Sequence, residues 1–550
     1  MPPDLPANYY HDNVLTLFAH VERVYADLLD GELLAFLECF AGLGPDAQKL
    51  YIRLLNRSHE WYRASKLNYP EIGALDAAID ELDARACIKV NPEVEFATLL
   101  SLFSKPEILA HAGQRGLDKL NRAALEDLLL EQDDDALFSA LAGQDDLLQV
   151  LGRDQYQQCQ MLFFGNLNQS MTDFVLRDLG LNQYEAYRID PEHRPYRSQL
   201  EIQQHWLLHQ LETLFELCDR QDGEFLCELY SLIPSDIDPL APAFRKSEHL
   251  RYEIARQIER NGDLPGALER YRHCLLPPSR ERIARIYAQQ GRVRESLALC
   301  VEIIAQPIDE EETQFASQFS ARLARRQGLA APVTAAARRL DHQPETADLE
   351  IEFADSVELA VAEYFNRRDQ TETCYFVENS LFNGVLGLLL WEVIFAPLTG
   401  AFFNPFQYRP SDFYAHDFCA RRGELLEQAW SGIDDNAAIF EVVSERWPKK
   451  HGLMNPLVNW QDLDLGLIDL ALERIEHAHW RAIFDRILLD LRHNRAGFPD
   501  LVHFPPAGGY NLIEVKGPGD NLQKNQLRWM QYFHARGIPH RLARVRWIEN

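Results

Sequence analysis

Closely paired cysteines are missing from this sequence of 550 residues. Nine cysteines occur, and none of them belongs to a CxxC pair. Because a zinc finger needs closely spaced thiols, this pattern argues against one. Scattered thiols instead fit a protein that works in a reducing compartment.

A secretory signal and a membrane-spanning segment are also missing. The first residues, Met1 to Asp4, contain no basic region followed by an apolar core. The longest apolar run, from Val385 to Phe395, is too short to cross a bilayer, and it contains Glu392. We therefore expect a soluble, cytoplasmic protein with no membrane partner.

Positive charge is scarce, since 55 Lys and Arg residues stand against 84 Asp and Glu residues, a formal net charge of −29. A nucleic-acid-binding protein is usually basic, because neutralising phosphates drives its affinity. Local charge matters more, however, and it is uneven. Residues 133–135 and 309–312 are acidic blocks, expected to be solvated surface, whereas residues 536–546 are basic.

What the sequence does contain is a pair of short predicted strands near its C-terminus. The runs 497–502 and 510–517 flank a Pro- and Gly-rich turn. Side chains alternate along a strand, so Glu514 and Lys516 point to the same side. Asp500, near the start of the first strand, can reach that edge. Two carboxylates and a lysine there could hold a divalent metal ion beside a water molecule to be activated.

These residues form a PD…(D/E)xK motif, and their setting resembles the VRR-NUC nuclease domain. The run Gly517-Pro518-Gly519-Asp520, followed by Leu522, Lys524 and Gln526, makes the resemblance more specific than the bare motif. Over nearly its whole length the chain resembles the bacterial branch of the Fanconi-associated nuclease family. The resemblance implies a mostly α multidomain protein, with helical DNA-binding and repeat-like regions before a C-terminal α/β PD-(D/E)xK core.

The resemblance also implies a third acidic ligand just before a leucine- and tryptophan-containing helix. Glu378 matches that position, while Glu392 inside the helix is the competitor, and a plain helix-capping role for Glu378 is the alternative. We expect Glu378, Asp500, Glu514 and the Val515 carbonyl to bind one or two Mg²⁺ or Mn²⁺ ions. Lys516 is expected to orient the attacking water or to help deprotonate it.

The N-terminal half contains the predicted DNA contacts. Between residues 49 and 66 cations alternate with aromatic residues, which suits a duplex backbone, although an amphipathic helix with a solvated face is the alternative. Two predicted helices, 99–109 and 122–129, resemble a SAP-type module, and plain packing is the alternative. Residues 161–167 indicate a buried core element. The candidate phosphate contacts are Arg53, Arg57, Arg63, Lys66, Lys105, Arg115, Lys119, Arg122 and Arg177.

Residues 245–340 contain a degenerate helical repeat. Small residues recur at an offset of 29: Ala255, Gly262 and Ala267 correspond to Ala284, Gly291 and Ser296. Such residues let paired helices approach closely, as in tetratricopeptide-like units. A docking platform for repair proteins and a plain helical scaffold are both possible, and the residues alone favour the scaffold.

The C-terminal region contains two further expected features. Residues 396–495 are an expected helical insertion that packs the domain and shapes substrate access. After the ExK strand, residues 522–534 predict an amphipathic helix whose Lys524 and Arg528 are available to phosphate, and residues 541–548 predict a final strand.

The sequence thus predicts four regions. They are a helical DNA-binding domain (1–85), a SAP-like DNA-binding region (86–240), a tetratricopeptide-like region (241–345) and a VRR-NUC nuclease domain (346–550).

The resemblance implies a structure-specific DNA nuclease of phosphodiesterase I type. Its expected activities are a 5′-flap endonuclease and a 5′-to-3′ exonuclease on branched DNA, for interstrand crosslink repair at the bacterial nucleoid. The ubiquitin-binding zinc finger of eukaryotic relatives has no counterpart here. The alternatives are a four-way-junction resolvase and a non-catalytic repair scaffold.

Overall fold

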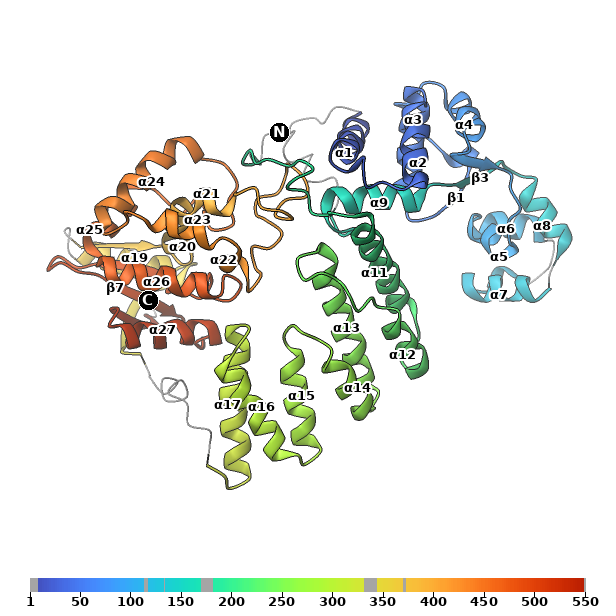
Figure 1. The fold of residues 1–550 in the computed structure, drawn as a ribbon. Coiled ribbons are helices and arrows are strands. Elements are labelled where there is room, and N and C mark those ends of the chain that lie inside the picture. The colour runs from blue at the N-terminus through green and yellow to red at the C-terminus, as the bar shows by residue number, and fades with distance from the viewer. Residues whose placement is uncertain are drawn as a thin grey trace. The chain divides into compact units, whose positions relative to one another are not determined.

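The computed structural model describes residues 8–112, 117–132, 134–169, 182–330, 344–368 and 372–548. The chain divides into two compact units, Met1–Leu181 with Arg197–Gln199 and Asn182–Tyr196 with Leu200–Asn550. Both are dominated by helices (Figure 1). Among the described residues, no helix is both long enough and apolar enough to span a membrane.

The first unit begins with a helical group. It contains α1 (Tyr9–Tyr25), α2 (Gly31–Ala41), α3 (Pro45–Leu55) and α4 (Leu75–Ala84). Leu17, Val21 and Leu50 on the facing sides of α1 and α3 are fully buried. Burial of this apolar face, rather than helix propensity alone, stabilises such short helices.

A three-stranded antiparallel sheet follows, and the sequence did not predict it. Its order is β1 (Trp61–Arg63), β3 (Leu147–Val150), β2 (Ile88–Val90). The expectation of helix throughout residues 1–85 is therefore wrong at Trp61–Arg63. Trp61 and Tyr62 favour a strand, and their partners, Gln149 and Leu148, lie more than eighty residues away.

The SAP-like region forms four short helices around a common apolar cluster. They are α5 (Phe96–Ser101), α6 (Lys105–Ala112), α7 (Arg122–Gln132) and α8 (Asp135–Ala142). Helix α9 (Arg153–Phe164) follows, and Met161 to Phe164 at its end are buried, which confirms the predicted core element for these four residues; residues 165–167 are half-buried. Arg115 and Arg177 lie outside the described residues.

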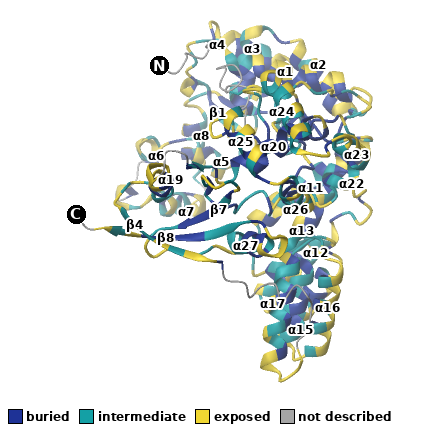
Figure 2. Cartoon of the chain, turned by 90° about the vertical axis from the view of Figure 1, so that its left-hand side faces the viewer, coloured by how far each residue is buried: buried dark blue, intermediate teal, exposed yellow. Residues whose placement is uncertain are grey.

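The second unit contains the predicted repeats. Helices α11 (Gln199–Leu217), α12 (Gly223–Ser231) and α13 (Pro242–Arg260) precede α14 (Leu264–Tyr271), α15 (Ser279–Gln289), α16 (Val293–Ala305) and α17 (Glu310–Arg326). The small repeat residues Ala255, Ala267, Ala284 and Ser296 are all 0% exposed. They allow the close helix contacts that the repeat predicted, and the buried sides of α15 to α17 face inward (Figure 2).

The C-terminal core is a five-stranded mixed sheet with the order β4-β8-β7-β6-β5. The strands are β4 (Thr346–Glu352), β5 (Thr373–Phe376), β6 (Leu501–Phe504), β7 (Asn511–Lys516) and β8 (His540–Ile548). Helix α19 (Val357–Arg368) covers one face, on which Ile513 and Val515 share its apolar cluster. By alternation Glu514 points away from that face.

Two strands of this sheet, β4 and β5, were not predicted. The acidic segment from Glu345 to Ala360 contains β4, which pairs in parallel with β8. Along β4, Ala347, Leu349 and Ile351 are half-buried, while the alternating polar residues are exposed. The acidic residues therefore lie on the exposed side of an edge strand, where charge discourages pairing with another chain.

Most of the remaining elements agree with the prediction, but the apolar segment, expected to be one helix, is interrupted at Leu390. The apolar segment forms α20 (Ser380–Leu389) and α21 (Trp391–Ile394). The insertion is helical, with α22 (Phe418–Arg421), α23 (Gly423–Trp430), α24 (Asn436–Lys450), α25 (Leu465–Arg474) and α26 (His477–Leu489). Helix α27 (Lys524–Arg536) connects β7 to β8. The predicted fold class is confirmed.

Candidate active site

The β6–β7 hairpin brings Asp500 next to the ExK strand. Leu501 pairs with Ile513, so Asp500 lies just outside β6 and opposite the end of β7. The Val515 N–H donates a 2.8 Å hydrogen bond to Asp500 Oδ2. The Asp500 carbonyl in turn accepts from the Val377 and Glu378 amides, at 2.8 and 2.9 Å. Hydrogen bonds to Asp500 therefore connect the segment that contains Glu378 and the strand that contains Glu514.

Glu514 is the most deeply buried acid of this group, at 0% exposure. Lys516 Nζ lies 2.7 Å from Glu514 Oε1, so the two side chains do point to the same side of β7, as predicted. The second oxygen, Glu514 Oε2, accepts no hydrogen bond from any described residue. A buried carboxylate oxygen without a donor is costly, and a bound cation would satisfy it.

The surroundings favour the protonated form of both acids. The pKa of Glu514 is raised to about 8, first by burial and then by the Asp500 charge, while Lys516 opposes the shift. Burial likewise raises the pKa of Asp500 to about 6, with smaller contributions from the Glu358 and Glu378 charges and opposition from the Val515 N–H and Lys516. A positive ion bound nearby would stabilise the charged form of both carboxyl groups.

Glu378 lies on a strained turn that is fastened to the Asp500 segment. Its φ of 32° falls in the left-handed region, which is unusual for a residue with a side chain. Asn379 fixes the turn, because its Oδ1 accepts from the Gly497 N–H at 3.0 Å and its Nδ2 donates to Glu378 Oε1 at 2.9 Å. The competitor Glu392 instead pairs with Lys450 at 3.6 Å. This arrangement favours Glu378 over Glu392 as the third acidic ligand.

Glu358 is an acid near the site that the sequence did not single out. It lies in the first turn of α19, where Ser356 Oγ donates to its Oε2 at 2.9 Å. The neighbouring Val357 side chain would lie 3.9 Å from a Cβ placed on Gly517, directly after Lys516. An acid at the start of the helix that precedes the core strands was the available signal, but the strand β5 after that helix was not predicted either.

The donor set fits a hard divalent ion. Asp500, Glu514 and Glu378 offer carboxylate oxygens, which Mg²⁺ and Mn²⁺ prefer. A soft metal is not favoured, because no thiol or imidazole takes part. The Val515 carbonyl remains a predicted ligand.

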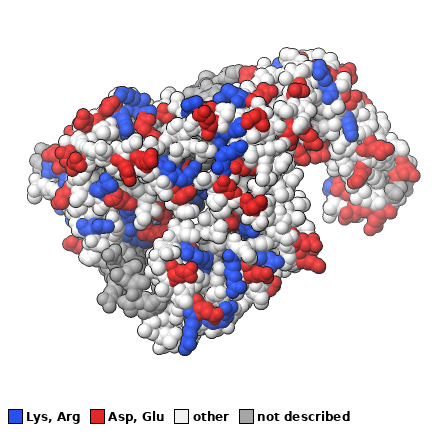
Figure 3. Space-filling view, viewed as in Figure 1, with Lys and Arg blue, Asp and Glu red and all other residues white. Residues whose placement is uncertain are grey.

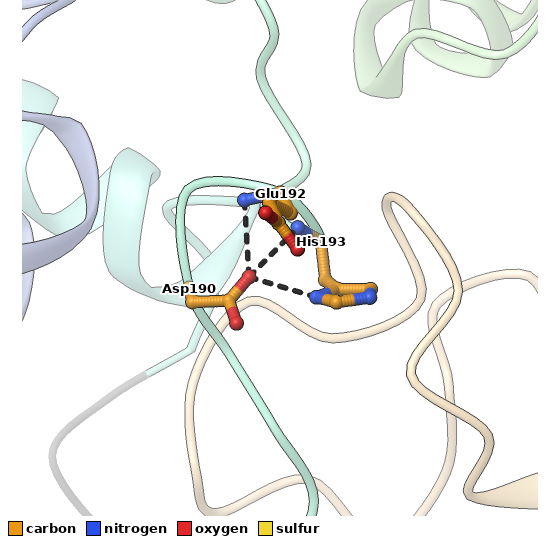
Figure 4. Close-up of side chains that lie close together, drawn as sticks. All are labelled: Asp190, Glu192 and His193. Carbon is orange, nitrogen blue, oxygen red and sulfur yellow. Dashed lines mark hydrogen bonds and ion pairs between the residues drawn. The ribbon is translucent and has the colours of Figure 1, made fainter.

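A second acidic group lies elsewhere in the same unit. The ligand atoms of Asp190, Glu192 and His193 all lie within 4.8 Å of one another. Asp190 Oδ1, however, already accepts from the Glu192 and His193 amides and contacts His193 Nδ1 at 2.7 Å (Figure 4). Arg188 also forms an ion pair with Asp190. These contacts indicate a turn stabilised by its own side chains.

Some of the predicted DNA contacts among residues 53–66 already form ion pairs within the protein, and others do not. Arg53 donates to Glu71 at 2.7 and 3.0 Å, and Lys66 lies 3.2 Å from Glu107. Arg57 is exposed and has no carboxylate partner among the described residues. Arg63 is 6% exposed and pairs with Asp145 at 3.1 Å and Glu107 at 2.8 Å, so its guanidinium offers little surface to DNA.

The SAP-like candidates are partly engaged in the fold. Lys105 donates to the Asp118 carbonyl at 2.8 Å, and Arg122 donates to the carbonyls of Phe103 and Leu100, while Lys119 is exposed. Residues 96–142 contain four cations and eight acids. Acidic side chains accordingly gather over the α5–α8 end of the first unit (Figure 3). This surface is less favourable to phosphate than the sequence suggested.

Lys524 and Arg528 line a cleft of about 610 Å³ in the second unit, formed by α15, α17, α27 and residues 492–496. Further cations line it: Arg285, Arg322 and Arg492. Lys524, Arg322 and Arg492 are exposed and have no carboxylate partner within the described part of the chain. Two acids, Glu281 and Glu311, also line it, so the cleft is basic overall. Sequence reasoning missed Arg322 and Arg492 here.

Two family models match this chain. Residues 434–547 match the VRR-NUC domain, and residues 8–89 match the FAN1, HTH domain. The Fanconi-associated nuclease 1 homolog of Pseudomonas aeruginosa is 34% identical over 99% of this chain and 97% of its own length. This chain belongs to the Fanconi-associated nuclease 1 family. The resemblance that the ExK strand indicated is thereby confirmed.

Other Fanconi-associated nuclease 1 relatives are more distant and longer. The Oryza sativa homolog is 21% identical over 95% of this chain, which spans 61% of that relative. The human protein is 22% identical over 98% of this chain, which spans 62% of it.

Solved structures resemble the whole chain. The crystal structure of paFAN1 bound to 2-nt 5′-flap DNA with a gap superposes with a TM-score of 0.83 at 32% identity and covers 100% of both chains. A second paFAN1 structure, bound to 1-nt 5′-flap DNA with a gap, gives 0.79, also at 32% identity, and covers 99% of this chain and 100% of paFAN1.

Proposed function

We propose that this protein is a structure-specific DNA nuclease that cleaves 5′-flap DNA by divalent-metal catalysis. The observation that supports this most strongly is the fully buried Glu514 carboxylate, whose Oε2 accepts no hydrogen bond from a described residue, next to Lys516 and the half-buried Asp500. The flap DNA bound to the related paFAN1 supports the choice of substrate. We infer a 5′-flap endonuclease and 5′-to-3′ exonuclease of phosphodiesterase I type, acting in interstrand crosslink repair.

The protein's own groups have distinct tasks in this chemistry. Asp500, Glu514 and Glu378 would hold one or two Mg²⁺ or Mn²⁺ ions, with the Val515 carbonyl as a further ligand. Such an ion supplies a Lewis acid that offsets phosphate charge and makes water more acidic. The Val515 N–H fixes the Asp500 carboxylate, which limits the freedom of that ligand.

Lys516 is the group best suited to the attacking water and the phosphate. Its Nζ is held 2.7 Å from Glu514, so the ammonium is positioned at the same side of β7 as the proposed ion site. There it would orient the water and neutralise charge that builds up on the phosphate. The water oxygen forms the new bond to phosphorus while the bond to the 3′-oxygen breaks.

The basic cleft provides the proposed path for the substrate backbone. Two of the segments that line it, residues 492–496 and the start of α27, lie four residues before Asp500 and eight residues after Lys516 in the sequence. They also contact each other, because Trp529 Nε1 donates to the Ala496 carbonyl at 3.2 Å. Phosphates held by Lys524, Arg528 and Arg492 would therefore lie close to the cleavage site.

Cleavage of a labelled 5′-flap DNA with Mn²⁺ or Mg²⁺ tests the proposal, with wild type and Asp500→Ala compared side by side. We expect metal-dependent cuts near the junction that disappear in the variant. Glu392→Gln is the matched control and should cut normally. Preferred cleavage of a four-way junction would support a resolvase, and flap binding without any cleavage by wild type would support a scaffold.

A further inference from the structure

The thiols of Cys39 and Cys87 are in contact within the first unit. Their Sγ atoms lie 3.1 Å apart, although the residues are separated by 48 positions in the sequence. Cys39 is near the C-terminal end of α2, and Cys87 directly precedes β2. The contact therefore joins a helix to the start of a strand, and both residues fall inside the segment that matches the FAN1, HTH domain.

The backbone around Cys87 fixes this contact. The Cys87 N–H donates to the Leu82 carbonyl at 2.9 Å, and the Cys87 carbonyl accepts from the Leu151 N–H at 3.0 Å. Cys39 Sγ also donates to the Arg85 carbonyl at 3.4 Å. Ala86, between Arg85 and Cys87, has a φ of 56°, a strained conformation that persists only where the surroundings hold it. The two thiols are thus held together by the fold.

The two thiols differ in how far a reagent can reach them. Cys39 is half-buried, whereas Cys87 is 3% exposed. Burial raises the pKa of the Cys87 thiol, and the neighbouring Cys39 adds to this shift, while the positive charge of Arg85 opposes it. Cys39 is consequently the thiol that meets an oxidant first, and Cys87 is placed to attack it afterwards.

We propose that Cys39 and Cys87 form a reversible dithiol–disulfide site that responds to peroxide. The Cys39 thiolate attacks a peroxide oxygen, which breaks the O–O bond and gives a sulfenic acid and one water. Cys87 then attacks the sulfenic sulfur, forms the S–S bond and releases a second water. Two thiols lose two electrons and two protons, and one hydrogen peroxide becomes two waters. A thiol reductant reverses the step by exchange.

The disulfide would close a loop that contains α3 and α4. Closing a loop of this length restricts the unfolded chain, so the oxidised protein should unfold at a higher temperature than the reduced protein. Helix α3 holds Arg53 and precedes Arg57, two of the predicted DNA contacts. The redox state of the pair would thus alter the stability of a predicted DNA-binding element.

Mass spectrometry of the full-length protein tests the site. Protein is exposed to hydrogen peroxide, its free thiols are blocked with N-ethylmaleimide, and it is digested without reductant. We expect a disulfide-linked pair of peptides containing Cys39 and Cys87, which dithiothreitol separates and which Cys39→Ala lacks. Cys419→Ala is the matched control, since Cys419 is also half-buried and donates to a backbone carbonyl but contacts no second thiol among the described residues, and it should leave the linkage unchanged.

A second readout does not depend on peptide mapping. The thermal midpoint of the peroxide-treated wild type should rise by roughly 5 °C over the reduced protein, and that of Cys39→Ala should not. Two results would overturn the proposal: full alkylation of both thiols after peroxide treatment, or oxidation of Cys39 to a sulfinic acid or an intermolecular disulfide with Cys87 left free.

Discussion

The Glu514 carboxylate lies inside the nuclease core, where Lys516 is its only ion-pair partner among the described residues. Its pKa and that of Asp500 lie well above the ordinary range for carboxyl groups, chiefly because both are buried. A bound cation would stabilise the ionised carboxylates and so lower both pKa values. The raised pKa values and the proposed metal site are therefore two consequences of the same burial.

The first prediction concerns the stability of the metal-free protein. The folded pKa of Glu514, about 8, exceeds its unfolded value, so the contribution of this group is fully present below about pH 4. It is lost as the pH rises toward 8. Between pH 5 and 8.5 wild type should lose on the order of 3 kcal/mol more unfolding free energy than Glu514→Gln. Urea unfolding in a metal chelator measures this, and parallel pH profiles would contradict it.

A second prediction separates the two candidate acids of the leucine-rich segment. Glu378→Gln should lower flap cleavage roughly 10- to 100-fold at limiting Mn²⁺, because a ligand that orients the ion is lost. Higher Mn²⁺ should restore part of the activity. Glu392→Gln, which removes only a surface pair with Lys450, should cleave like wild type. The opposite pattern would assign the third ligand to Glu392.

The sequence was sufficient for some of these residues and insufficient for others. Glu514 and Lys516 are two apart on a strand, so their shared side follows from strand geometry alone. The position of Asp500 next to these two residues follows from the short hairpin that joins the two strands. Glu358 depends instead on how α19 packs against the end of β7, a tertiary contact that no local pattern encodes.

Among the elements, α15, α17 and α27 form the basic cleft although the chain as a whole is acidic. Its cations come from segments more than two hundred residues apart, such as Arg285 on α15 and Lys524 on α27. Arg528 joins α27 to α17 through a 3.2 Å hydrogen bond to Gln314. A charge count along the sequence cannot reveal a surface that is assembled in this way.

The third prediction follows from this cleft. Lys524→Ala should weaken flap binding and should reduce the slope of log affinity against log salt by about 1, because one phosphate contact is removed. Lys449→Ala is the control, since Lys449 pairs with Glu445 on the exposed side of α24. Fluorescence anisotropy at several salt concentrations measures both slopes, and equal slopes for Lys524→Ala and wild type would exclude the cleft as a backbone site.

Arg63 gives the fourth prediction, in the first unit. Arg63→Ala should destabilise the fold by about 3 kcal/mol, because it leaves the carboxylates of Asp145 and Glu107 without their guanidinium partner. Arg57→Ala removes no ion pair and should change stability by less than about 0.5 kcal/mol. Urea unfolding of both variants measures these two changes in the free energy of unfolding. A larger loss for Arg57→Ala than for Arg63→Ala would contradict these assigned roles.

Most of the elements that the sequence missed are short strands. β1 has three residues and β5 has four, too few to show a period, and each obtains its hydrogen bonds from a distant partner. The long helices were predictable because each buries a regular apolar face. β4 does alternate over seven residues, but its acidic side concealed the pattern.

For the whole molecule, the net charge of −29 and the proposed DNA substrate are compatible because the charge is unevenly distributed. Acids cover the α5–α8 end of the first unit, whereas unpaired cations line the cleft of the second. Ions at physiological strength screen charges more than about 8 Å apart, so local cations dominate phosphate binding. The four regions expected from the sequence remain a prediction, finer than the division into two units.

Isothermal titration calorimetry of Mn²⁺ binding to the DNA-free protein tests whether these carboxylates form the metal site. Wild type at pH 8 should bind one or two ions, with weaker binding at pH 6 because Glu514 and Asp500 must lose protons. Asp500→Asn and Glu514→Gln should each abolish that binding, and Glu392→Gln should preserve it. Equal binding by wild type and both site variants would show that these carboxylates do not form the metal site.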